Sequence, residues 1–527
     1  MAYNSAAGLS GMLKSGHRHI WDDAVLRNLE AAVELSNMVC TSLGPFGRHK
    51  LIVNHLEKLY VTSDCNTILR ELEVEHPAAK LLVMAADMQD QECGDATNLV
   101  VSFAGEVLRM AKDLMRMGLH TSEVIAGYQT AADKLYELLP TLVCDTIHVK
   151  DSSPEAFLKV ISPVLAAKHY GTHEVLAPLV LQACQTVMDD KYSVQPEAVR
   201  VVKVLGGSVG QSLMIPGYVA QRGVETTITS VIGPKIGVFA CGIEASSTEA
   251  KGTVLMKTAE DLKGYNRSEE NKMEEIIQGI ANSGVSVVVT GGNVSEMALH
   301  FIDRYKLMCL KIGSKWELRR LCQATGATAL VRLGAPTPDE MGSADSVQVQ
   351  QLGGRTLTVF KMTQTKLATL ILRASTSSVL QDLERAADDG VRAFQQMCRD
   401  GRVVPGAGAT EMALSQKLHQ LAQVSPGLDQ YAIGAFAKAL EVVPRTLADT
   451  AGLDATKVIA DLHAAHANGN TKAGVDLEEG KVVTTEIVDL LNTKLSAFRL
   501  AMDAALTVLR VDQIIMSKQA GAGGPAK

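Results

Sequence analysis

The chain has 527 residues, of which 46% are hydrophobic and 21% charged, and its formal net charge is -7. This length exceeds one compact core, and a rule of about 150 residues per domain predicts three or four units. A nucleic-acid surface is not expected, because the chain has no clustered Lys/Arg run and only 4% aromatic residues.

The nine cysteines are scattered, and no pair has the C-x-x-C spacing of a zinc or redox site. They predict reduced thiols in a reducing compartment. We find no signal core in residues 1–20 and no uncharged apolar run of about 18 residues. The sequence therefore predicts a cytoplasmic protein with no membrane partner.

The first 140 residues read mainly as helices, because apolar residues recur at helical spacing and the pattern stops at glycines. The predicted helices span 22–43, 77–92 and 96–117, and the predicted short strands span 51–54 and 58–63.

β-rich runs alternate with helical patterns in the middle of the chain, which indicates an α/β domain. The runs are 285–290, 309–312, 356–360 and 368–372, and the helical patterns are 269–282 and 315–325. Helical character returns after about residue 405 and persists to 515. The pattern predicts a helical domain, built from both chain ends, that encloses an α/β insertion.

Three common motifs are absent. Gly44 is not followed by the Gly-Lys-Ser/Thr ending of a P-loop, and Gly406-Ala407-Gly408 lacks the third glycine of a dinucleotide fingerprint. His173-Glu174 has no second histidine one turn on, which excludes a zincin helix.

Two short motifs are suited to phosphate, and each has a plain structural alternative. Gly94 to Asn98 precedes a predicted helix whose N-terminus would suit phosphate, while Asp95 would hold a phosphate-bound magnesium ion. Alternatively, Asp95 only caps the helix. Leu43-Gly44-Pro45 is either a turn that approaches a ligand closely or an ordinary helix stop.

Two further aspartates are equally ambiguous alone. Asp64 is either a site residue or the N-cap of the following helix. Asp389 lies off the apolar stripe of its predicted helix, which favours a solvated face.

In order and spacing, however, these motifs together resemble the group II chaperonins, and specifically the eukaryotic cytosolic chaperonin. The resemblance covers essentially the whole chain. Beyond the motifs above, it is carried by Glu73 to Lys80, Val404 to Glu411, Gly474-Val475-Asp476, Asp489 and Val511 to Ile515.

The resemblance implies an α+β multidomain fold in which an α/β apical domain is inserted in a mainly helical equatorial domain. The implied divisions are an equatorial ATP-binding domain (1–144 and 405–527), a small intermediate domain (145–215 and 373–404) and an apical client-binding domain (216–372) with a protrusion at about 246–270. Residues 294–307 and 315–325 are the expected client contacts.

The resemblance also implies an ATP hydrolase that uses ATP and Mg²⁺ within a hetero-oligomeric double ring. Its implied partners are paralogous subunits and unfolded or partly folded clients such as actin and tubulin. Asp389 would position or deprotonate the attacking water, Asp64 would help to hold that water, and Asp95 would coordinate the metal.

The implied nucleotide-binding residues include Lys168, which would sense the γ-phosphate unless it is a plain surface lysine, and Asp489, which would accept a ribose hydroxyl. The full set is Leu43, Gly44, Pro45, Gly94, Asp95, Ala96, Thr97, Asn98, Ala167, Lys168, Gly406, Ala407, Gly408 and Asp489.

This sequence departs from the family at several of these positions. Ala96 and Ala407 replace glycines, Cys65-Asn66 replaces a Gly-Ala pair, and Leu490 replaces a proline. A methyl group at Ala96 would crowd the phosphates if that backbone has a positive φ. A ring subunit that binds nucleotide with little hydrolysis therefore remains an alternative, as does a non-ring ATPase.

Overall fold

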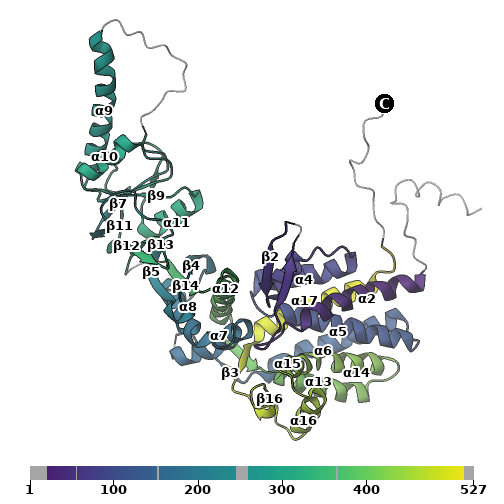
Figure 1. The fold of residues 1–527 in the computed structure, drawn as a ribbon. Coiled ribbons are helices and arrows are strands. Elements are labelled where there is room, and N and C mark those ends of the chain that lie inside the picture. The colour runs from purple at the N-terminus through teal and green to yellow at the C-terminus, as the bar shows by residue number, and fades with distance from the viewer. Residues whose placement is uncertain (1–20, 55, 151–152, 245–258, 364–365, 515–527) are drawn as a thin grey trace, which may run out of the picture. The chain divides into compact units, whose positions relative to one another are not determined.

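A computed structural model describes residues 21–54, 56–150, 153–244, 259–363 and 366–514 (Figure 1). Contacts divide the chain into two compact units, which we describe separately. Unit 1 comprises Met1–His173 and Asp388–Lys527, and unit 2 comprises Glu174–Ala387. Unit 1 is thus built from both parts of the chain that flank unit 2, and purple, green and yellow segments mix within it in Figure 1.

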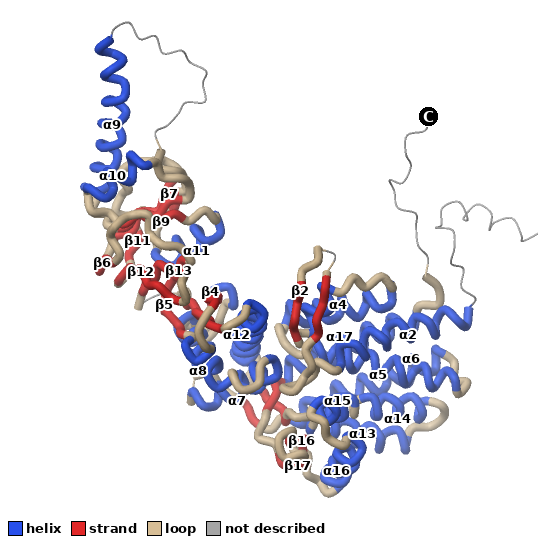
Figure 2. The backbone as a smooth tube through the Cα atoms, viewed as in Figure 1, coloured by secondary structure: helices blue, strands red, loops and turns tan. Residues whose placement is uncertain are grey.

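Unit 1 is mainly a helical bundle (Figure 2). Its helices are α2 (Trp21–Cys40), α3 (Cys65–Glu71), α4 (Pro77–Glu92), α5 (Thr97–Arg116), α6 (Thr121–Leu138), α7 (Pro154–Lys168), α13 (Ala409–Val424), α14 (Asp429–Ala439), α15 (Val442–Thr450), α16 (Ala455–Ala467) and α17 (Leu491–Arg510). A short 3₁₀ turn, η1 (Leu139–Leu142), follows α6.

The bundle packs around α5, because this helix is apolar on most of its circumference and is buried accordingly. Phe103 of α5 meets Phe436 and Phe498 edge to face, with ring centroids 5.5 and 5.2 Å apart. All three rings are fully buried. Aromatic contacts of this geometry add to the free energy gained from burial alone, so the segments on either side of unit 2 share one core.

Small sheets border the bundle. They are formed by β1 (Lys50–Val53) with β2 (Leu59–Thr62), by β16 (Ala473–Asp476) with β17 (Lys481–Thr484), and by β18 (Val488–Leu490), β15 (Arg402–Pro405) and β3 (Asp145–Thr146) in that order. In the last sheet Val404 pairs with Asp489, which fixes the position of that aspartate.

Unit 2 contains two larger sheets. One has the order β10 (Ala329–Leu330), β7 (Lys235–Phe239), β8 (Val287–Thr290) and β9 (Met308–Lys311), with β11 (Gly342–Ser343) also paired to β7. The other has the order β4 (Val199–Leu205), β14 (Ala368–Ala374), β5 (Leu213–Ala220), β13 (Arg355–Lys361), β12 (Ser346–Leu352) and β6 (Ser230–Ile232).

Helices accompany these sheets. They are α8 (His173–Val187), α9 (Ala259–Asn282), α10 (Glu296–Arg304) and α11 (Lys315–Thr325), with 3₁₀ turns η2 (Pro196–Ala198) and η3 (Val209–Gln211). Helix α12 (Ser377–Arg399) begins in unit 2 and ends in unit 1. β7, β8 and β9 are parallel and almost wholly buried, as parallel strands usually are.

The mixed helix-and-sheet fold with an inserted unit is confirmed. The predicted helices 77–92 and 315–325 coincide with α4 and α11. The return of helices after about residue 405 is confirmed by α13 to α17, but its persistence to 515 was wrong, because β16 to β18 interrupt the helices and α17 ends at Arg510. The predicted protrusion lies partly outside the described residues, since 245–258 are not described. The three-domain boundaries stay a prediction.

Within the described ranges, no helix has the length and apolar character needed to span a bilayer.

Candidate functional site

A cavity of about 200 Å³ lies in unit 1. Most of the residues that the sequence analysis assigned to a nucleotide line it: Leu43, Gly44, Asp95, Ala96, Thr97, Asn98, Ala167, Lys168, Ala407, Gly408 and Asp489. Pro45, Gly94 and Gly406 are each adjacent in the chain to a lining residue. Segments separated by up to about 450 residues of sequence therefore meet at one cavity.

The turn before α5 has a left-handed backbone. Gly94 has φ +75°, and Ala96, the N-cap of α5, has φ +62° and ψ +21°. No side chain caps this helix, so the alternative that Asp95 serves as its N-cap is wrong. The buried Gln89 amide donates to the Asp95 carbonyl at 2.9 Å and to the Thr493 carbonyl at 3.2 Å, which anchors the turn to α17.

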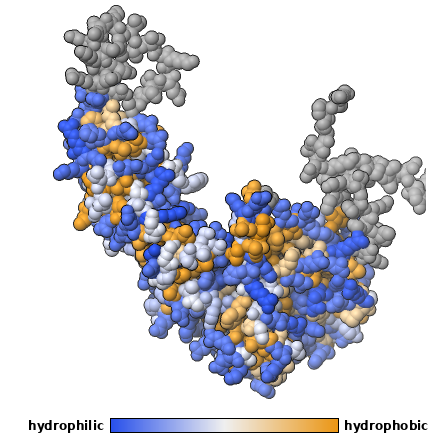
Figure 3. All heavy atoms as spheres, viewed as in Figure 1, coloured by the Kyte–Doolittle hydropathy of each residue, from blue (hydrophilic) through white to orange (hydrophobic). Residues whose placement is uncertain are grey.

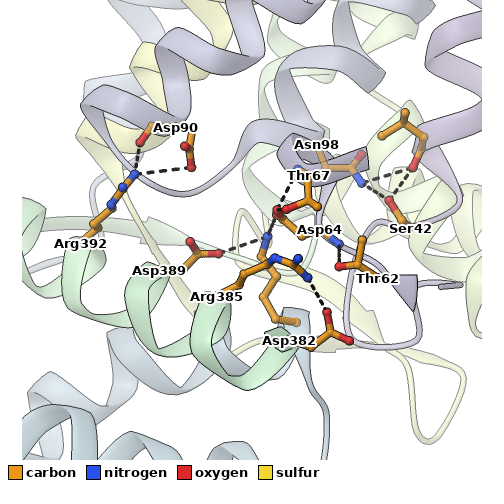
Figure 4. Close-up of polar contacts among 12 residues, drawn as sticks. Ser42, Thr62, Asp64, Thr67, Asp90, Asn98, Asp382, Arg385, Asp389 and Arg392 are labelled. Carbon is orange, nitrogen blue, oxygen red and sulfur yellow. Dashed lines mark hydrogen bonds and ion pairs between the residues drawn. The ribbon is translucent and has the colours of Figure 1, made fainter. Parts of the chain in front are cut away.

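The turn after α2 is tied to the same helix end. Gly44 has φ +82°, and a Cβ there would collide with the Leu447 side chain. The Asn98 amide donates to Ser42 Oγ at 2.9 Å and to the Val39 carbonyl at 3.3 Å (Figure 4). The turn that stops α2 is thus held next to the open N-terminus of α5, and its close approach to a ligand stays a prediction.

Lys168, the last residue of α7, pairs with two aspartates from distant parts of the chain. Its ammonium binds Asp64 Oδ1 and lies 3.1 Å from Asp389 Oδ2. The three side chains are only 12 to 15% exposed. Figure 4 shows the carboxylates of Asp64 and Asp389 facing each other. The alternatives of a surface lysine at 168 and a solvated face at Asp389 are therefore wrong.

Neighbouring contacts fix both aspartates. Asp64 is the N-cap of α3, and its Oδ2 accepts from Thr67 N at 3.0 Å and from Thr67 Oγ1 at 2.7 Å. Asp389 is held through α12, whose Arg392 donates to the Asp90 carbonyl at the end of α4 (Figure 4). The interpretation of Asp64 as an N-cap is therefore confirmed, and its role in the site stays a prediction that its pairing with Lys168 supports.

The two carboxyls that pair with Lys168 have pKa values shifted in opposite directions. Burial alone would raise the pKa of Asp64, but Lys168 and the hydrogen bonds from Thr67 lower it well below its usual range. Burial raises the pKa of Asp389 well above its usual value, and Lys168 offsets this only in part. Burial likewise raises the pKa of Asp95. Carboxyls with pKa values driven apart are typical of acid–base sites.

Other parts of the cavity come from β15, α13 and β18. Ala407 has φ +52° and Gly408 φ +79°, and a Cβ at Gly408 would lie 2.8 Å from Pro444 Cβ. Gly406 approaches Asp489 closely, since a Cβ there would lie 3.2 Å from Asp489 Oδ2. Ala407 thus holds, with a Cβ attached, a backbone conformation that favours glycine.

Among the lining residues that sequence reasoning missed are Lys494 and Glu411, which form a buried ion pair at 2.7 Å. A signal for Lys494 was present, because it lies at helical spacing from Leu491 and Phe498 in a stripe that is otherwise apolar. Glu411 likewise lies within a buried run on α13. Cys65, also missed as a lining residue, is buried beside Asp64.

The site residues suit a magnesium nucleotide. Within the described ranges no group of three or more His, Cys, Asp and Glu residues is placed to hold a metal ion by itself. Mg²⁺ usually binds through one or two carboxylates together with phosphate oxygens and waters. Asp95, at the uncapped start of α5, offers such a carboxylate where helix N–H groups suit phosphate.

Comparison with known proteins agrees with the fold. The profile of the TCP-1/cpn60 chaperonin family matches residues 35–519, so the chain belongs to that family. It is a chaperonin, a member of a class that takes part in protein folding and that generally hydrolyses ATP.

Its curated relatives include proteins named T-complex protein 1 subunit theta. The protein of Arabidopsis thaliana is 48% identical over 99% of this chain and 96% of the relative. Those of Dictyostelium discoideum and Homo sapiens are each 45% identical over 99% of this chain, covering 98% and 96% of the relatives. The sequence predicts a resemblance to a theta subunit from segments 317–322, 332–338 and 442–448 together with Asn98, and these relatives confirm that resemblance for the chain as a whole.

Removal of the Lys168 cation tests the electrostatics of the site. We expect Lys168→Met to lower the free energy of unfolding by about 3–5 kcal/mol, the usual cost of breaking a buried pair. The pKa of the buried Asp389, already raised by burial, would then rise further, because the opposing charge of Lys168 is gone.

The sign of the pH dependence follows. A carboxyl with a raised folded-state pKa stabilises the fold fully below its unfolded pKa, and this contribution is lost as the pH rises through the folded-state value. The loss of unfolding free energy caused by Lys168→Met should therefore grow from pH 5 to pH 8, as measured by urea unfolding at each pH. Lys112→Met, which removes the partner of the half-exposed Glu30, is the control and should show a small, flat effect. A pH-independent deficit in Lys168→Met would contradict the interpretation.

Proposed function

We propose that this chain is an ATP-hydrolysing subunit of a hetero-oligomeric chaperonin ring that folds client proteins in the cytoplasm, without nucleic-acid or membrane partners. The single observation that carries the proposal is the Lys168 ammonium held between Asp64 and Asp389 beside the open N-terminus of α5. Phosphoryl transfer needs mainly placed charges, a metal and backbone N–H groups rather than covalent chemistry.

Each residue then has a distinct task. The N–H groups at the start of α5 would bind phosphate, and Asp95 would hold Mg²⁺, which would supply neutralisation of phosphate charge. Lys168 contacts the terminal phosphate. Asp389 accepts the proton of the attacking water, for which a raised pKa is suitable, while the ionised Asp64 orients that water.

We assign the three domains as the family resemblance implies: an equatorial domain that holds the cavity, an intermediate domain that carries Asp389, and an apical domain that contacts clients. The exposed Trp316 on α11 supports client contact, since 72% of its surface is accessible.

The β1–β2 hairpin supports assembly with neighbouring subunits. Leu51, Val53 and Leu59 are each at least 60% exposed there, and apolar side chains gather over the hairpin in Figure 3. A two-stranded sheet with an apolar exposed surface invites further pairing or packing.

Assembly is tested by purification from native cytosol. We expect the chain to elute in a particle of about a megadalton together with its paralogues, as a closed double ring requires. Electron microscopy of that particle should show stacked rings. Recovery of the chain only as a stable monomer would exclude the ring and favour a non-ring ATPase.

Catalysis is tested with Asp389→Ala. Nucleotide affinity at this subunit should stay nearly unchanged, while its hydrolysis falls by about 10²-fold or more, the usual scale for a lost general base. Asp382→Ala, which removes another buried aspartate two turns earlier on α12, is the matched control. Unchanged turnover in Asp389→Ala would favour the alternative of a subunit that binds nucleotide with little hydrolysis.

The left-handed Ala96 predicts a site poorer than one built with glycine. A Cβ at φ +62° costs on the order of 1 kcal/mol. Ala96→Gly should therefore tighten nucleotide binding, by up to about fivefold, or speed hydrolysis at this subunit. Subunit-resolved nucleotide occupancy measures the effect.

The control for this variant is Ala455→Gly at the start of α16, which lies outside the cavity and has no positive φ. It should only loosen a helix end. Equal occupancy and equal turnover in wild type and Ala96→Gly would refute the prediction.

A further inference from the structure

A second buried ionic array borders the cavity and is not used by the mechanism above. Lys494 Nζ of α17 lies 2.7 Å from Glu411 Oε1 of α13 and 2.9 Å from Asp489 Oδ2 of β18. The Lys494 and Glu411 side chains are 8% and 1% exposed, whereas Asp489 is 35% exposed. Two members are thus inside the protein, and only Asp489 reaches solvent.

Such an array is costly to bury. A buried ammonium needs strong partners, and burial would otherwise lower the pKa of Lys494, yet Asp489 and Glu411 raise it. The lysine therefore stays charged. With two carboxylates and one ammonium, the array has a net charge of -1, so it is not a neutral pair that merely fills space.

The array is also incomplete. Glu411 Oε2 is buried at the cavity and has no hydrogen-bond partner within the described part of the chain. Asp489 Oδ2 is bound by the Lys494 ammonium, and the Asp489 side chain also lines the cavity. Buried polar atoms are nearly always paired, so the unpaired Glu411 oxygen at the cavity indicates a ligand that donates a hydrogen bond there.

The position of Asp489 is fixed from three sides. Lys494 binds one oxygen, Val404 pairs with its backbone in the sheet, and the absence of a side chain at Gly406 leaves room for Oδ2. A carboxylate that is held in this way accepts a hydroxyl hydrogen bond without losing further rotamer freedom.

We propose that Lys494 and Glu411 are positioning residues for Asp489, the residue that the family resemblance assigns to the ribose, and that their hold on Asp489 sets how strongly the cavity prefers ribose to deoxyribose. The inference rests on the proposed nucleotide-binding function. Glu411 holds the ammonium, and the ammonium holds Asp489. A hydrogen bond to a charged acceptor contributes about 1.5–3 kcal/mol, which corresponds to a preference of about tenfold or more.

The test uses the assembled particle that contains the full-length chain. Radiolabelled 8-azido-ATP is photo-crosslinked, and labelling of this chain alone is quantified after separation of the subunits. ATP and 2′,3′-dideoxy-ATP compete with the label, and the ratio of their competition constants measures sugar preference. We expect about tenfold preference for ATP in the wild type.

Lys494→Met should reduce this ratio to about one, because Asp489 then loses its orientation. Glu411→Gln, which keeps a hydrogen-bond acceptor for Lys494, should reduce it in part, and it serves if Lys494→Met does not assemble. Asp489→Ala should abolish the preference, and Asp489→Ala combined with Lys494→Met should reduce it no further, since Lys494 acts through Asp489. Lys112→Met, remote from the cavity, should leave the ratio unchanged.

The outcomes separate the inference from the proposed function. If ATP does not compete for labelling of the wild-type chain, the proposed nucleotide binding fails. If ATP competes but the wild type shows no sugar preference, or the preference is as strong in Lys494→Met or in Glu411→Gln as in the wild type, the positioning role is overturned while nucleotide binding stands.

Discussion

The pairing of one buried ammonium with two carboxylates organises the site of this chaperonin. Lys168 must find partners because an unpaired charge inside a protein is strongly unfavourable. Those partners, Asp64 and Asp389, lie more than 100 and 200 residues away in the chain, so the pairing brings α3, α7 and the end of α12 together. Once they meet, burial and charge set opposite pKa shifts on the two carboxyls.

Backbone conformation places a second constraint on the same cavity. The turns that carry Gly44, Gly94 and Gly408 all have positive φ, which suits glycine. Ala96 and Ala407 have the same conformation with a Cβ attached, so the surrounding structure must hold them there. Gln89 supplies part of this support through its hydrogen bond to the Asp95 carbonyl. The fold thus keeps the geometry of the turns even where the residue no longer favours it.

Much of the fold and part of the candidate site could be predicted from the sequence, because long amphipathic helices and ordered motifs are strong signals. Helices α4 and α11 follow from periodicity, and motif order places Asp64, Asp95 and Lys168 together. Short strands such as β16 and β18 were missed, since a three- or four-residue strand depends on its partner rather than on its own pattern. The burial of Asp389 was also missed, because periodicity cannot report the neighbours that cover a helix face.

Lys494 shows most clearly what a sequence pattern cannot predict. Its place in an apolar stripe was visible in the sequence, but a lysine there is equally explained by its long stem reaching solvent. The structure decides against that, because the ammonium lies between Glu411 and Asp489 and the side chain is only 8% exposed. The cavity is therefore bordered by two lysines of the same kind. Each is buried and paired with two carboxylates, so the charges that face a ligand are fixed by the protein interior before the ligand arrives.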